Sequence, residues 1–449
     1  MLTVLELIGW MMEIGAILML IWLAITLFIE REMKRLPRAL IPGILLIASF
    51  AAVLAGDFPH RTVMLSISEL LVLGIGLLFF LPIGKLEKMV IPLEIPRFDE
   101  RDIMFARAGY REGKANYRDY YDRHPEKRKP DDHIRTLPGL CSPGASTYEP
   151  ISARIARSGF QFLEHIRPLA EGAFAPEKQA TSPGQITTTL KGLAKYHGAK
   201  IVGVTETRPY HYYSYRGRSP DNYGDEIIHT HKFAIVFAVE MDYWMVKTAP
   251  LAPVVIESCK EYIEAAKIGM VLAYFIRQLG FDARNHMDGN YLVCAPLVAH
   301  DAGIGELSRM GTIITQDYGP RVRLGVVTTD LPLVADEPIV FGVQDSCQAC
   351  KKCAQTCPSQ AIPHGDKSLH DGVLKWKISQ EKCYEFWCKV GTDCAICMNT
   401  CPYSKPNTLI HRLYRLSLQQ SSLSRRIMVH FDDYLYGRRP STSQKPDWM

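Results

Sequence analysis

The chain has 449 residues, of which 47% are hydrophobic and 22% are charged; this is the composition of a folded protein and excludes a disordered one. A chain of this length is expected to form more than one domain. The formal net charge of +5 is small for its size, so charge gives no reason to expect a nucleic-acid partner.

Three apolar runs dominate the N-terminal region, Ile8–Phe28, Ala39–Gly56 and Val63–Ile83. A helix needs about twenty apolar residues to cross the hydrocarbon core of a membrane. The first and third runs reach that length, and the second is at the short limit. Three such runs in succession are rare outside membranes. We therefore expect a three-helix membrane anchor in residues 1–88, in preference to the buried helices of a soluble domain.

Basic residues predict the orientation of these spans. They lie between the first and second runs and after the third, at Arg31, Lys34, Arg35, Arg38, Lys85 and Lys88. Positively charged loops stay in the cytoplasm, and no twin-arginine signal precedes the runs. We expect a multi-pass protein of the cytoplasmic membrane whose large domain faces the cytoplasm. Two acids inside the spans, Glu13 and Glu69, are either functional or paired within the bundle, since an isolated intramembrane carboxylate is costly.

From about Ile95 the composition becomes that of a soluble protein. Residues 110–133 are charged and rich in tyrosine, and they fit a solvated connector or an interface arm equally well. Helix and strand signals then alternate, with helices at Ile186–His197 and Ser258–Leu279, each followed by a glycine, and strands at Lys200–Val204, Phe233–Val239 and Val322–Thr328. This alternation predicts an α/β core.

Twelve cysteines occur in the chain, and nine of them are crowded between Cys347 and Cys401. Most belong to two closely spaced runs, C-x2-C-x2-C-x3-C-P from Cys347 to Pro358 and C-x2-C-x3-C-P from Cys394 to Pro402. The first run has the spacing with which bacterial ferredoxins hold [4Fe-4S] clusters. A zinc site uses two pairs of cysteines instead. The spacing therefore predicts two cubane clusters and a redox protein.

In a tandem of such runs, the fourth cysteine of each run binds the cluster of the other run. One cluster is therefore expected on Cys347, Cys350, Cys353 and Cys401. The other is expected on Cys357, Cys383, Cys394 and Cys397. Cys388 is an alternative to Cys383 as the upstream ligand. Two clusters form an electron relay and not a reaction centre, so another region must bind the substrate.

Ordered blocks between about Phe98 and Asn407 resemble the reductive dehalogenase family of corrinoid iron–sulfur proteins. They include FDERDIMFAR, AKIVGVTE, VEMDYWMVKTAP, DAGIGELSRMG and YGPRVRLGVVTTDLPL, and they end in the cysteine region. More distantly, the chain is similar to epoxyqueuosine reductases. The resemblance implies a nitroreductase-like α/β core that holds cobalamin or another corrinoid, and it favours Cys383 over Cys388.

The expected fold is therefore multi-domain. Residues 1–88 form the N-terminal transmembrane helices, and residues 89–165 form a connecting arm and the N-terminal part of the catalytic unit. Residues 166–338 form the corrinoid-binding α/β core. Residues 339–410 form a ferredoxin-like domain with two [4Fe-4S] clusters, and residues 411–449 form a C-terminal tail that is polar and basic.

The resemblance also implies a catalytic pair, because in the family a tyrosine protonates the substrate carbon and a nearby Arg or Lys lowers the pKa of that tyrosine. Such a cation stabilises the phenolate that is left behind. The best-matching positions are Tyr243 and Arg309, with Tyr212, Tyr213 and Tyr215 as rival donors. Residues expected to contact the corrinoid are Asn285, His286, Asn290, Gly303, Gly305 and Gly311; glycines there let the backbone approach a large ring.

We therefore expect a membrane-anchored, corrinoid- and iron–sulfur-dependent oxidoreductase of the reductive dehalogenase type. Electrons from quinol or from a reduced ferredoxin or flavodoxin would pass through the clusters and cobalt to a halogenated small molecule. One alternative is an epoxide or other non-halogen reductase on the same cofactors. Another is a membrane electron-transfer ferredoxin, which leaves the α/β region without a role. The sequence identifies neither the substrate nor the electron donor nor the oligomeric state.

Overall fold

The computed structural model of the chain describes residues 4–57, 59–439 and 441–449. The chain divides into two compact units, and neither is continuous in sequence. One unit combines Met1–Glu87 with Pro406–Pro440, and the other combines Lys88–Lys405 with Ser441–Met449. The first is called the membrane unit below, and the second the catalytic unit.

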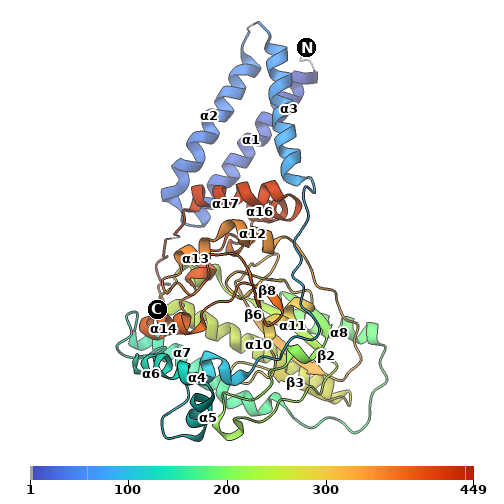
Figure 1. Ribbon diagram of the computed structural model, residues 1–449. Coiled ribbons are helices and arrows are strands. Elements are labelled where there is room, and N and C mark those ends of the chain that lie inside the picture. The colour runs from blue at the N-terminus through green and yellow to red at the C-terminus, as the bar shows by residue number, and fades with distance from the viewer. Residues whose placement is uncertain (1–3, 58, 440) are drawn as a thin grey trace. The chain divides into compact units, whose positions relative to one another are not determined.

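Three long helices of the membrane unit are apolar and long enough to cross a membrane: α1 (Val4–Ile29), α2 (Leu36–Ala55) and α3 (Arg61–Phe80) (Figure 1). The three predicted helices are thus confirmed. Glu13 and Glu69 are both buried in the bundle, at 3% and 6% exposure. Gly9 permits this packing, because a Cβ there would lie 2.6 Å from Cδ2 of Leu54 and 3.1 Å from Oε1 of Glu69.

Two more helices, α16 (Leu409–Gln420) and α17 (Ser422–Tyr436), complete the membrane unit where the sequence predicted a polar tail. Hydrogen bonds join them to the ends of all three apolar helices. Nε2 of His411 lies 2.6 Å from Oε1 of Glu30, just after α1. Ser424 donates to the carbonyl of Phe79 in α3 at 2.9 Å, and Tyr434 donates to that of Arg38 in α2 at 2.9 Å. Residues 406–440 therefore form one unit with the N-terminal helices, and the predicted tail at residues 411–449 is not a separate segment.

The centre of the catalytic unit is a four-stranded antiparallel sheet in the order β1-β2-β6-β3. Its strands are β1 (Ile201–Glu206), β2 (Phe233–Glu240), β6 (Val322–Thr329) and β3 (Ala283–His286). The first three were predicted from their apolar runs. The fourth strand was missed because Arg284, Asn285 and His286 give it no apolar signal, although all of its residues are buried.

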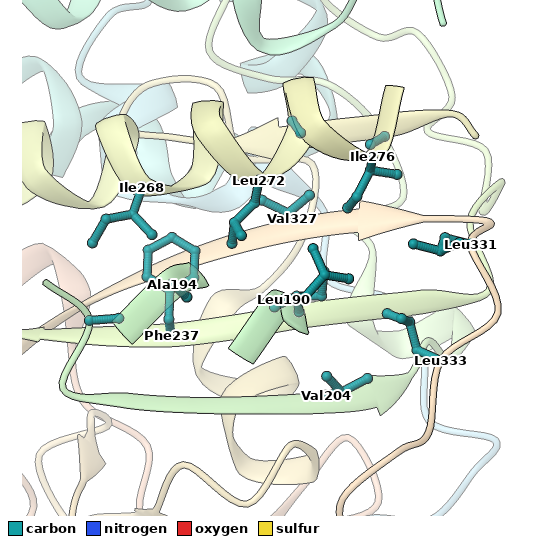
Figure 2. Packing of buried hydrophobic residues seen from close by; sticks show 14 of the residues in the cluster. Leu190, Ala194, Val204, Phe237, Ile268, Leu272, Ile276, Val327, Leu331 and Leu333 are labelled. Atoms are coloured by element: carbon teal, nitrogen blue, oxygen red, sulfur yellow. The ribbon is translucent and has the colours of Figure 1, made fainter. Parts of the chain in front are cut away.

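Successive residues of β2 point to opposite faces of the sheet, as the pleat of a strand requires. Ile235, Phe237 and Val239 pack against α8 (Pro183–Tyr196) and α10 (Ala252–Gln278), as Figure 2 shows for Phe237. Ala234, Val236 and Ala238 pack on the other face, where α11 (Ala295–Asp301) lies. Both predicted helices are present, and each is followed by a glycine with positive φ, Gly198 at 113° and Gly280 at 82°. The α/β core is therefore confirmed.

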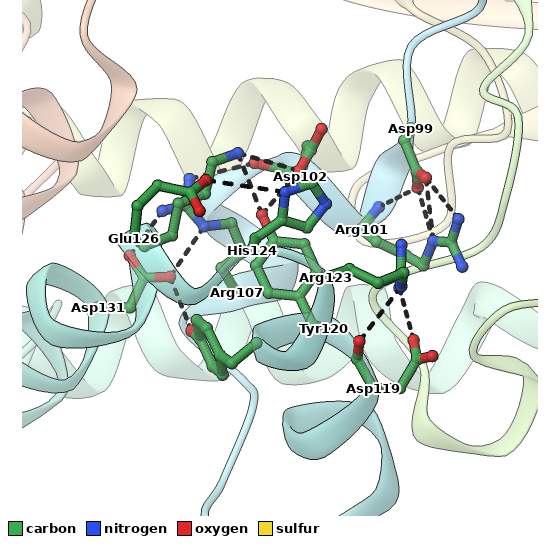
Figure 3. Close-up of polar contacts among 12 residues, drawn as sticks. Asp99, Arg101, Asp102, Arg107, Asp119, Tyr120, Arg123, His124, Glu126 and Asp131 are labelled. Atoms are coloured by element: carbon green, nitrogen blue, oxygen red, sulfur yellow. Dashed lines mark hydrogen bonds and ion pairs between the residues drawn. The ribbon is translucent and has the colours of Figure 1, made fainter.

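The tyrosine-rich segment is not a solvated connector, because its tyrosines are buried. It contributes α5 (Ala115–Arg123) and α6 (Pro125–Thr136), between α4 (Met104–Arg107) and α7 (Pro150–Ile166). Its tyrosines are buried together, at positions Tyr110, Tyr117, Tyr120 and Tyr121. Arg107 is fully buried and binds both carboxylate oxygens of Asp131, at 2.9 and 2.7 Å (Figure 3). Some of the charged residues that suggested a solvated segment thus form ion pairs inside a polar and aromatic core.

Short helices and loops form the cysteine-rich region. Its elements are α12 (Val343–Cys350), α13 (Lys352–Thr356), β7 (Ser368–His370), β8 (Val373–Lys375), α14 (Gln380–Val390) and α15 (Ile396–Thr400). Lys351 and Ala395 occupy the same place in the two cysteine runs, and both adopt positive φ, at 54° and 53°. The two runs therefore fold alike, with α13 and α15 in contact.

Candidate functional site

The cysteines of the C-terminal region gather in two groups. Burial raises the pKa of Cys353, and the neighbouring thiols that raise it further are Cys347, Cys397, Cys401 and Cys350. Burial also raises the pKa of Cys397, whose thiol neighbours are Cys394, Cys383 and Cys357. Cys401 is therefore a neighbour of the first run, as is Cys397, and Cys357 is a neighbour of the second run. This exchange is the arrangement that crossed ligation requires.

Cys383 and Cys388 lie on different sides of α14. Five residues along a helix correspond to a rotation of about 140°. The thiol of Cys383 has Cys357 as its nearest electrostatic neighbour, and burial raises its pKa to about 11. Cys388 is instead buried in an apolar cluster with Met104 and Ile134. Within the described residues, Cys388 thus belongs to packing and Cys383 to the second cysteine group.

The donor set fits clusters better than single ions. Within the part of the chain that the structure describes, no three His, Cys, Asp or Glu side chains converge as ligands of one metal ion would. A cubane does not need that convergence, since each of its four thiolates binds a different iron. Two groups of four thiols fit two [4Fe-4S] clusters.

Arg309 lies beside the first cysteine group. Its guanidinium is fully buried and donates to the carbonyls of Cys347 at 3.1 Å and of Pro363 and Gly365 at 2.7 Å each. Its guanidinium carbon is 4.4 Å from the centroid of the Trp376 ring. These contacts tie Arg309 to the loops of the first group. They do not support its predicted pairing with a catalytic phenol.

Tyr243, the predicted proton donor, begins α9 (Tyr243–Lys247) and is 9% exposed. The cations recorded over its ring are Lys247 at 5.5 Å and Arg321 at 5.6 Å. Arg321 itself donates to the carbonyls of Ser404 and Met241, both at 2.5 Å. Arg321 thus occupies the place beside Tyr243 that the sequence assigned to Arg309, and the catalytic role of Tyr243 stays a prediction.

The three polar residues expected to contact the corrinoid are engaged with the protein. His286 accepts from the Leu292 N–H at Nδ1, at 3.1 Å, so its Nε2 carries the proton toward Oγ1 of Thr328, 2.9 Å away. Burial lowers the pKa of His286 well below its usual value, which keeps the ring neutral. Oδ1 of Asn290 accepts from Arg284 at 2.8 Å. The Asn285 amide donates to the Ala266 carbonyl at 3.1 Å, while its Oδ1 has no hydrogen-bond partner among the described residues.

The three glycines of the predicted site have local structural reasons to be glycine. A Cβ at Gly303 would lie 2.6 Å from the carbonyl oxygen of Glu337, and one at Gly305 would lie 2.1 Å from that of Ile314. Gly311 has a φ of 75°, which side chains other than glycine rarely adopt. Chain packing therefore explains these glycines, and their contact with a corrinoid stays a prediction.

A different tyrosine–arginine pair lies between α10 and β6. The guanidinium carbon of Arg323 is 5.0 Å from the ring centroid of Tyr262. Arg323 donates to Oγ of Ser258 at 2.6 Å and to Oδ2 of Asp393 at 2.9 Å. Burial raises the pKa of Tyr262, and Arg323 is the group that most opposes this rise. A half-buried phenol with a cation at its face is the arrangement expected of a tuned proton donor.

Tyr291 lies near this pair, because Tyr262 raises its pKa and Arg323 lowers it, while burial is the main cause that raises it. Tyr213 and Cys294 are neighbours of each other, and burial raises the pKa of both, that of the Cys294 thiol to about 11. All three side chains are half-buried. The two other rival tyrosines lie elsewhere, since Tyr212 is buried against the sheet and Tyr215 lies under Arg101.

Asp393 connects this pair to the second cysteine group. Its carboxylate binds Arg323 and the hydroxyl of Ser258, and the next residue is Cys394. The sequence reading missed this site because Tyr262 lies within the apolar spacing of a helix and Arg323 lies within an apolar strand. The available signal was a single arginine in the run VRLGVVT and an acid directly before a cluster cysteine.

Comparison with known proteins agrees with these features. Residues 346–405 match the 4Fe-4S dicluster domain family. The chain is 32% identical over 299 residues to a tetrachloroethene reductive dehalogenase of Sulfurospirillum multivorans, covering 59% of each protein. It is 36% identical over 199 residues to an enzyme of the same name from Desulfitobacterium hafniense, covering 42% of this chain and 36% of that one. An epoxyqueuosine reductase of Atelocyanobacterium thalassa is 29% identical over 114 residues, 24% of this chain and 36% of that protein.

Solved structures extend the similarity to the fold. A catabolic reductive dehalogenase in complex with 3-bromo-4-hydroxybenzoic acid matches 80% of this chain and 49% of its own, with a TM-score of 0.65 and 26% identity. A reductive dehalogenase whose structure suggests a mechanism for B12-dependent dehalogenation matches 80% of this chain and 48% of its own, with a TM-score of 0.63 and 26% identity. The chain thus spans about half the length of these structures. Sequence and fold together identify the chain as a homologue of the reductive dehalogenases, which are oxidoreductases, with a 4Fe-4S dicluster domain at residues 346–405.

Proposed function

We propose that this chain is a membrane-anchored reductive dehalogenase that passes electrons through two [4Fe-4S] clusters and a corrinoid to an organohalide. Reductive removal of a halide consumes two electrons and one proton, and it yields the hydrogenated product and the halide ion. The observation that carries the proposal is the link from Tyr262 through Arg323 and Asp393 to the second cysteine group. This link supports a proton donor at Tyr262 next to an electron carrier at the second cysteine group.

The clusters are assigned from the two cysteine groups. One cluster is held by the thiolates of Cys347, Cys350, Cys353 and Cys401, and the other by those of Cys357, Cys383, Cys394 and Cys397. The proximity of Cys401 to the first run and of Cys357 to the second supports this division. The position of Asp393 favours the second cluster as the one that delivers electrons to the corrinoid.

The corrinoid is inferred from the relatives, one of which is described as B12-dependent. When bound, a corrinoid supplies a low-potential cobalt that carries electrons to the carbon–halogen bond. The corrinoid is proposed to lie beside Tyr262 and its neighbour Tyr291, two half-buried phenols next to the cation of Arg323.

Tyr262 is proposed as the proton donor in preference to Tyr243. Arg323 would stabilise the phenolate of Tyr262 after proton transfer, and Asp393 holds Arg323 in position. Tyr262 keeps more accessible surface than Tyr243, which is almost fully buried. A substrate can therefore approach the hydroxyl of Tyr262 more readily.

The membrane unit is proposed to anchor the enzyme in the cytoplasmic membrane with the catalytic unit facing the cytoplasm. This orientation follows from the basic residues between α1 and α2 and after α3. A quinol, or a reduced ferredoxin or flavodoxin, would then donate the electrons. A reporter fused after Met449 should be cytoplasmic, and a periplasmic signal would reverse the orientation.

A second candidate is the reduction of an epoxide or another non-halogenated substrate on the same cofactors, which the weaker similarity to an epoxyqueuosine reductase favours. A simple electron-transfer ferredoxin is disfavoured, since it would give the Tyr262–Arg323 pair no role.

The decisive experiment is an anaerobic assay of the reconstituted, full-length protein against a panel of halogenated compounds, with halide release as the readout. Iron, sulfide and corrinoid contents are measured first, and a Cys383→Ala variant serves as the control with an incomplete electron path. Halide release that requires both cofactors supports the proposal. Epoxide reduction without activity on any halide would favour the second candidate, and a protein that carries clusters but binds no corrinoid would favour the electron carrier.

A further inference from the structure

The helices α16 and α17 expose apolar side chains along one face each. On α16 these are Leu409, Leu413 and Leu416, whose spacing of four and three residues follows a single helical face. On α17 they are Leu423, Ile427, Phe431 and Tyr434. Their exposure ranges from 38% to 53%. Single exposed apolar residues are ordinary on proteins, but two stripes along adjacent helices call for a cause.

The opposite faces of the same helices bury polar groups. The buried polar side chains are His411, Arg415 and Ser417 of α16 and Ser424, Arg425 and Asp432 of α17, all at 4% exposure or less. Arg415 donates to Oδ1 of Asn407 at 2.8 Å, and Arg425 donates to the Leu418 carbonyl at 3.0 Å. The same faces also bury apolar side chains, at Tyr414, Leu418, Val429, Leu435 and Tyr436. Both faces of the hairpin thus carry apolar residues, whereas a helix that covers a protein in water keeps its outer face polar. The medium at the exposed stripes is therefore expected to be apolar.

The position of the hairpin within the membrane unit identifies that medium. Its hydrogen bonds reach Glu30, Arg38 and Phe79, which lie at the end of α1, the start of α2 and the end of α3. These three points are on the same side of the bundle, where apolar helices of this length emerge from the hydrocarbon. The stripes thus continue the apolar surface of the bundle.

We propose that α16 and α17 form an in-plane membrane element whose apolar face enters the lipid interface around the α1–α3 bundle. The exposed charges agree with this position, because Arg412, Arg426 and His430 alternate with the apolar residues. Basic side chains beside an apolar stripe bind anionic headgroups at the depth where interfacial helices lie. The proposal concerns the C-terminal segment, which the anchor at residues 1–88 does not include, and it does not depend on the reaction that the enzyme catalyses.

The test uses the full-length holoprotein in vesicles of phosphatidylcholine and phosphatidylglycerol. Leu416→Cys and Phe431→Cys are each labelled with the fluorophore NBD. Leu369→Cys is the matched control, because Leu369 is a 71% exposed apolar residue on β7 of the catalytic unit. The unsubstituted protein, labelled in parallel, corrects for the native cysteines. Quenching is then compared between lipids with a nitroxide near the headgroup and iodide in the buffer.

The labels at Leu416 and Phe431 should be quenched several-fold more by nitroxide lipids than the label at Leu369, and less by iodide. Equal quenching by iodide at all three positions would show that water covers the stripes and would overturn the proposal. Protection from iodide without quenching by lipid would also overturn it, since a protein surface would then cover the stripes. A variant on the buried face is not needed, because all three labelled positions are exposed in the absence of lipid, at 41%, 44% and 71%.

Discussion

The two cysteine groups lie in different electrostatic surroundings. Beside the first group, Arg309 is fully buried and bonds main-chain carbonyls; among the described residues, no carboxylate forms an ion pair with it. Beside the second group, Arg323 forms an ion pair with Asp393 at 2.9 Å and lies over the ring of Tyr262. Arg309 thus faces the cysteines of the first group without a carboxylate in an ion pair, whereas Arg323 belongs to a pair that is close to neutral.

This difference separates two tasks. A cluster gains negative charge when it is reduced, and a nearby buried cation stabilises the reduced state. We therefore interpret Arg309 as a group that sets the potential of the first cluster. An arginine that is paired with a carboxylate changes the reduction potential of a nearby cluster less. It can still stabilise the phenolate that remains when an adjacent tyrosine loses its proton. We interpret Arg323 as the group that positions and tunes the proton donor.

The largest effect is expected from removing a ligand of the second group. Cys383→Ala should reduce the iron content from about eight to about four atoms per chain and abolish halide release, while Cys388→Ala should leave both near the wild-type level. Iron analysis and electron paramagnetic resonance of the reduced protein would measure this. If Cys388→Ala lost a cluster while Cys383→Ala kept its full iron content, Cys388 and not Cys383 would be the upstream ligand of the second cluster.

Tyr262→Phe should lower single-turnover dehalogenation by roughly a hundred- to ten-thousandfold, the contribution typical of general acid catalysis. Tyr243→Phe is the matched variant, and it should retain most of the activity. Both should keep normal cluster and corrinoid contents, because neither phenol is a ligand. The opposite ranking of the two variants would return the role of donor to Tyr243.

The pH dependence provides a second test of the same donor. The active form of the acid is the protonated phenol, and burial raises the pKa of Tyr262 above its ordinary value. The wild-type rate should therefore be constant through neutral pH and should fall only as alkaline pH removes the proton. A rate that already falls between pH 6 and 8, on the order of the range in which histidines titrate, would point to a different proton donor.

Arg323→Met should reduce turnover by about ten- to a hundredfold, since an opposite charge shifts a neighbouring pKa by roughly one to three units. The alkaline limb of the pH profile should move to higher pH, because the cation that lowers the pKa of Tyr262 is lost. Arg323→Lys should keep part of the turnover and part of the normal position of the alkaline limb, because lysine retains the positive charge but lacks the planar fork of arginine. An unchanged alkaline limb in Arg323→Met would show that the arginine has only a structural role.

The smallest effect is expected at Arg309. Arg309→Met should lower the potential of the first cluster by on the order of 60 mV, which is tenfold in a one-electron equilibrium, and should slow turnover only modestly. A redox titration followed by electron paramagnetic resonance would resolve the two clusters, with the second cluster as the internal control. If both potentials stayed unchanged while turnover fell as far as in Tyr262→Phe, Arg309 would be a catalytic residue after all.

The fold could be predicted where burial coincides with an apolar pattern. The strands β2 and β6 and the helix α10 each have a continuous pattern that their burial explains. The strand β3 has no such pattern because its polar groups are satisfied by partners distant in sequence, as with His286 and Thr328. The burial of the tyrosine-rich segment could not be predicted for a related reason. Its Asp131 is charged, but Arg107 neutralises this charge inside the protein.

The candidate site was only partly predictable. Cysteine spacing is local, and it indicated both groups and their crossing. The proposed proton donor instead depends on residues that a helix and a strand bring together. The distance between Tyr262 and Arg323 along the sequence does not indicate that the two side chains are in contact. The family resemblance supplied the idea of a tyrosine with a cation, but the structure was needed to choose among several tyrosines and arginines.

The pairing of Glu30 with His411 has a consequence for the synthesis of the protein. Glu30 is fully buried just after α1, yet its imidazole partner lies on α16 and is made only after residues 88–405 of the catalytic unit. A ribosome must therefore translate these residues before the first unit acquires its last helices. A chain that terminates within the catalytic unit lacks the histidine that contacts this buried acid.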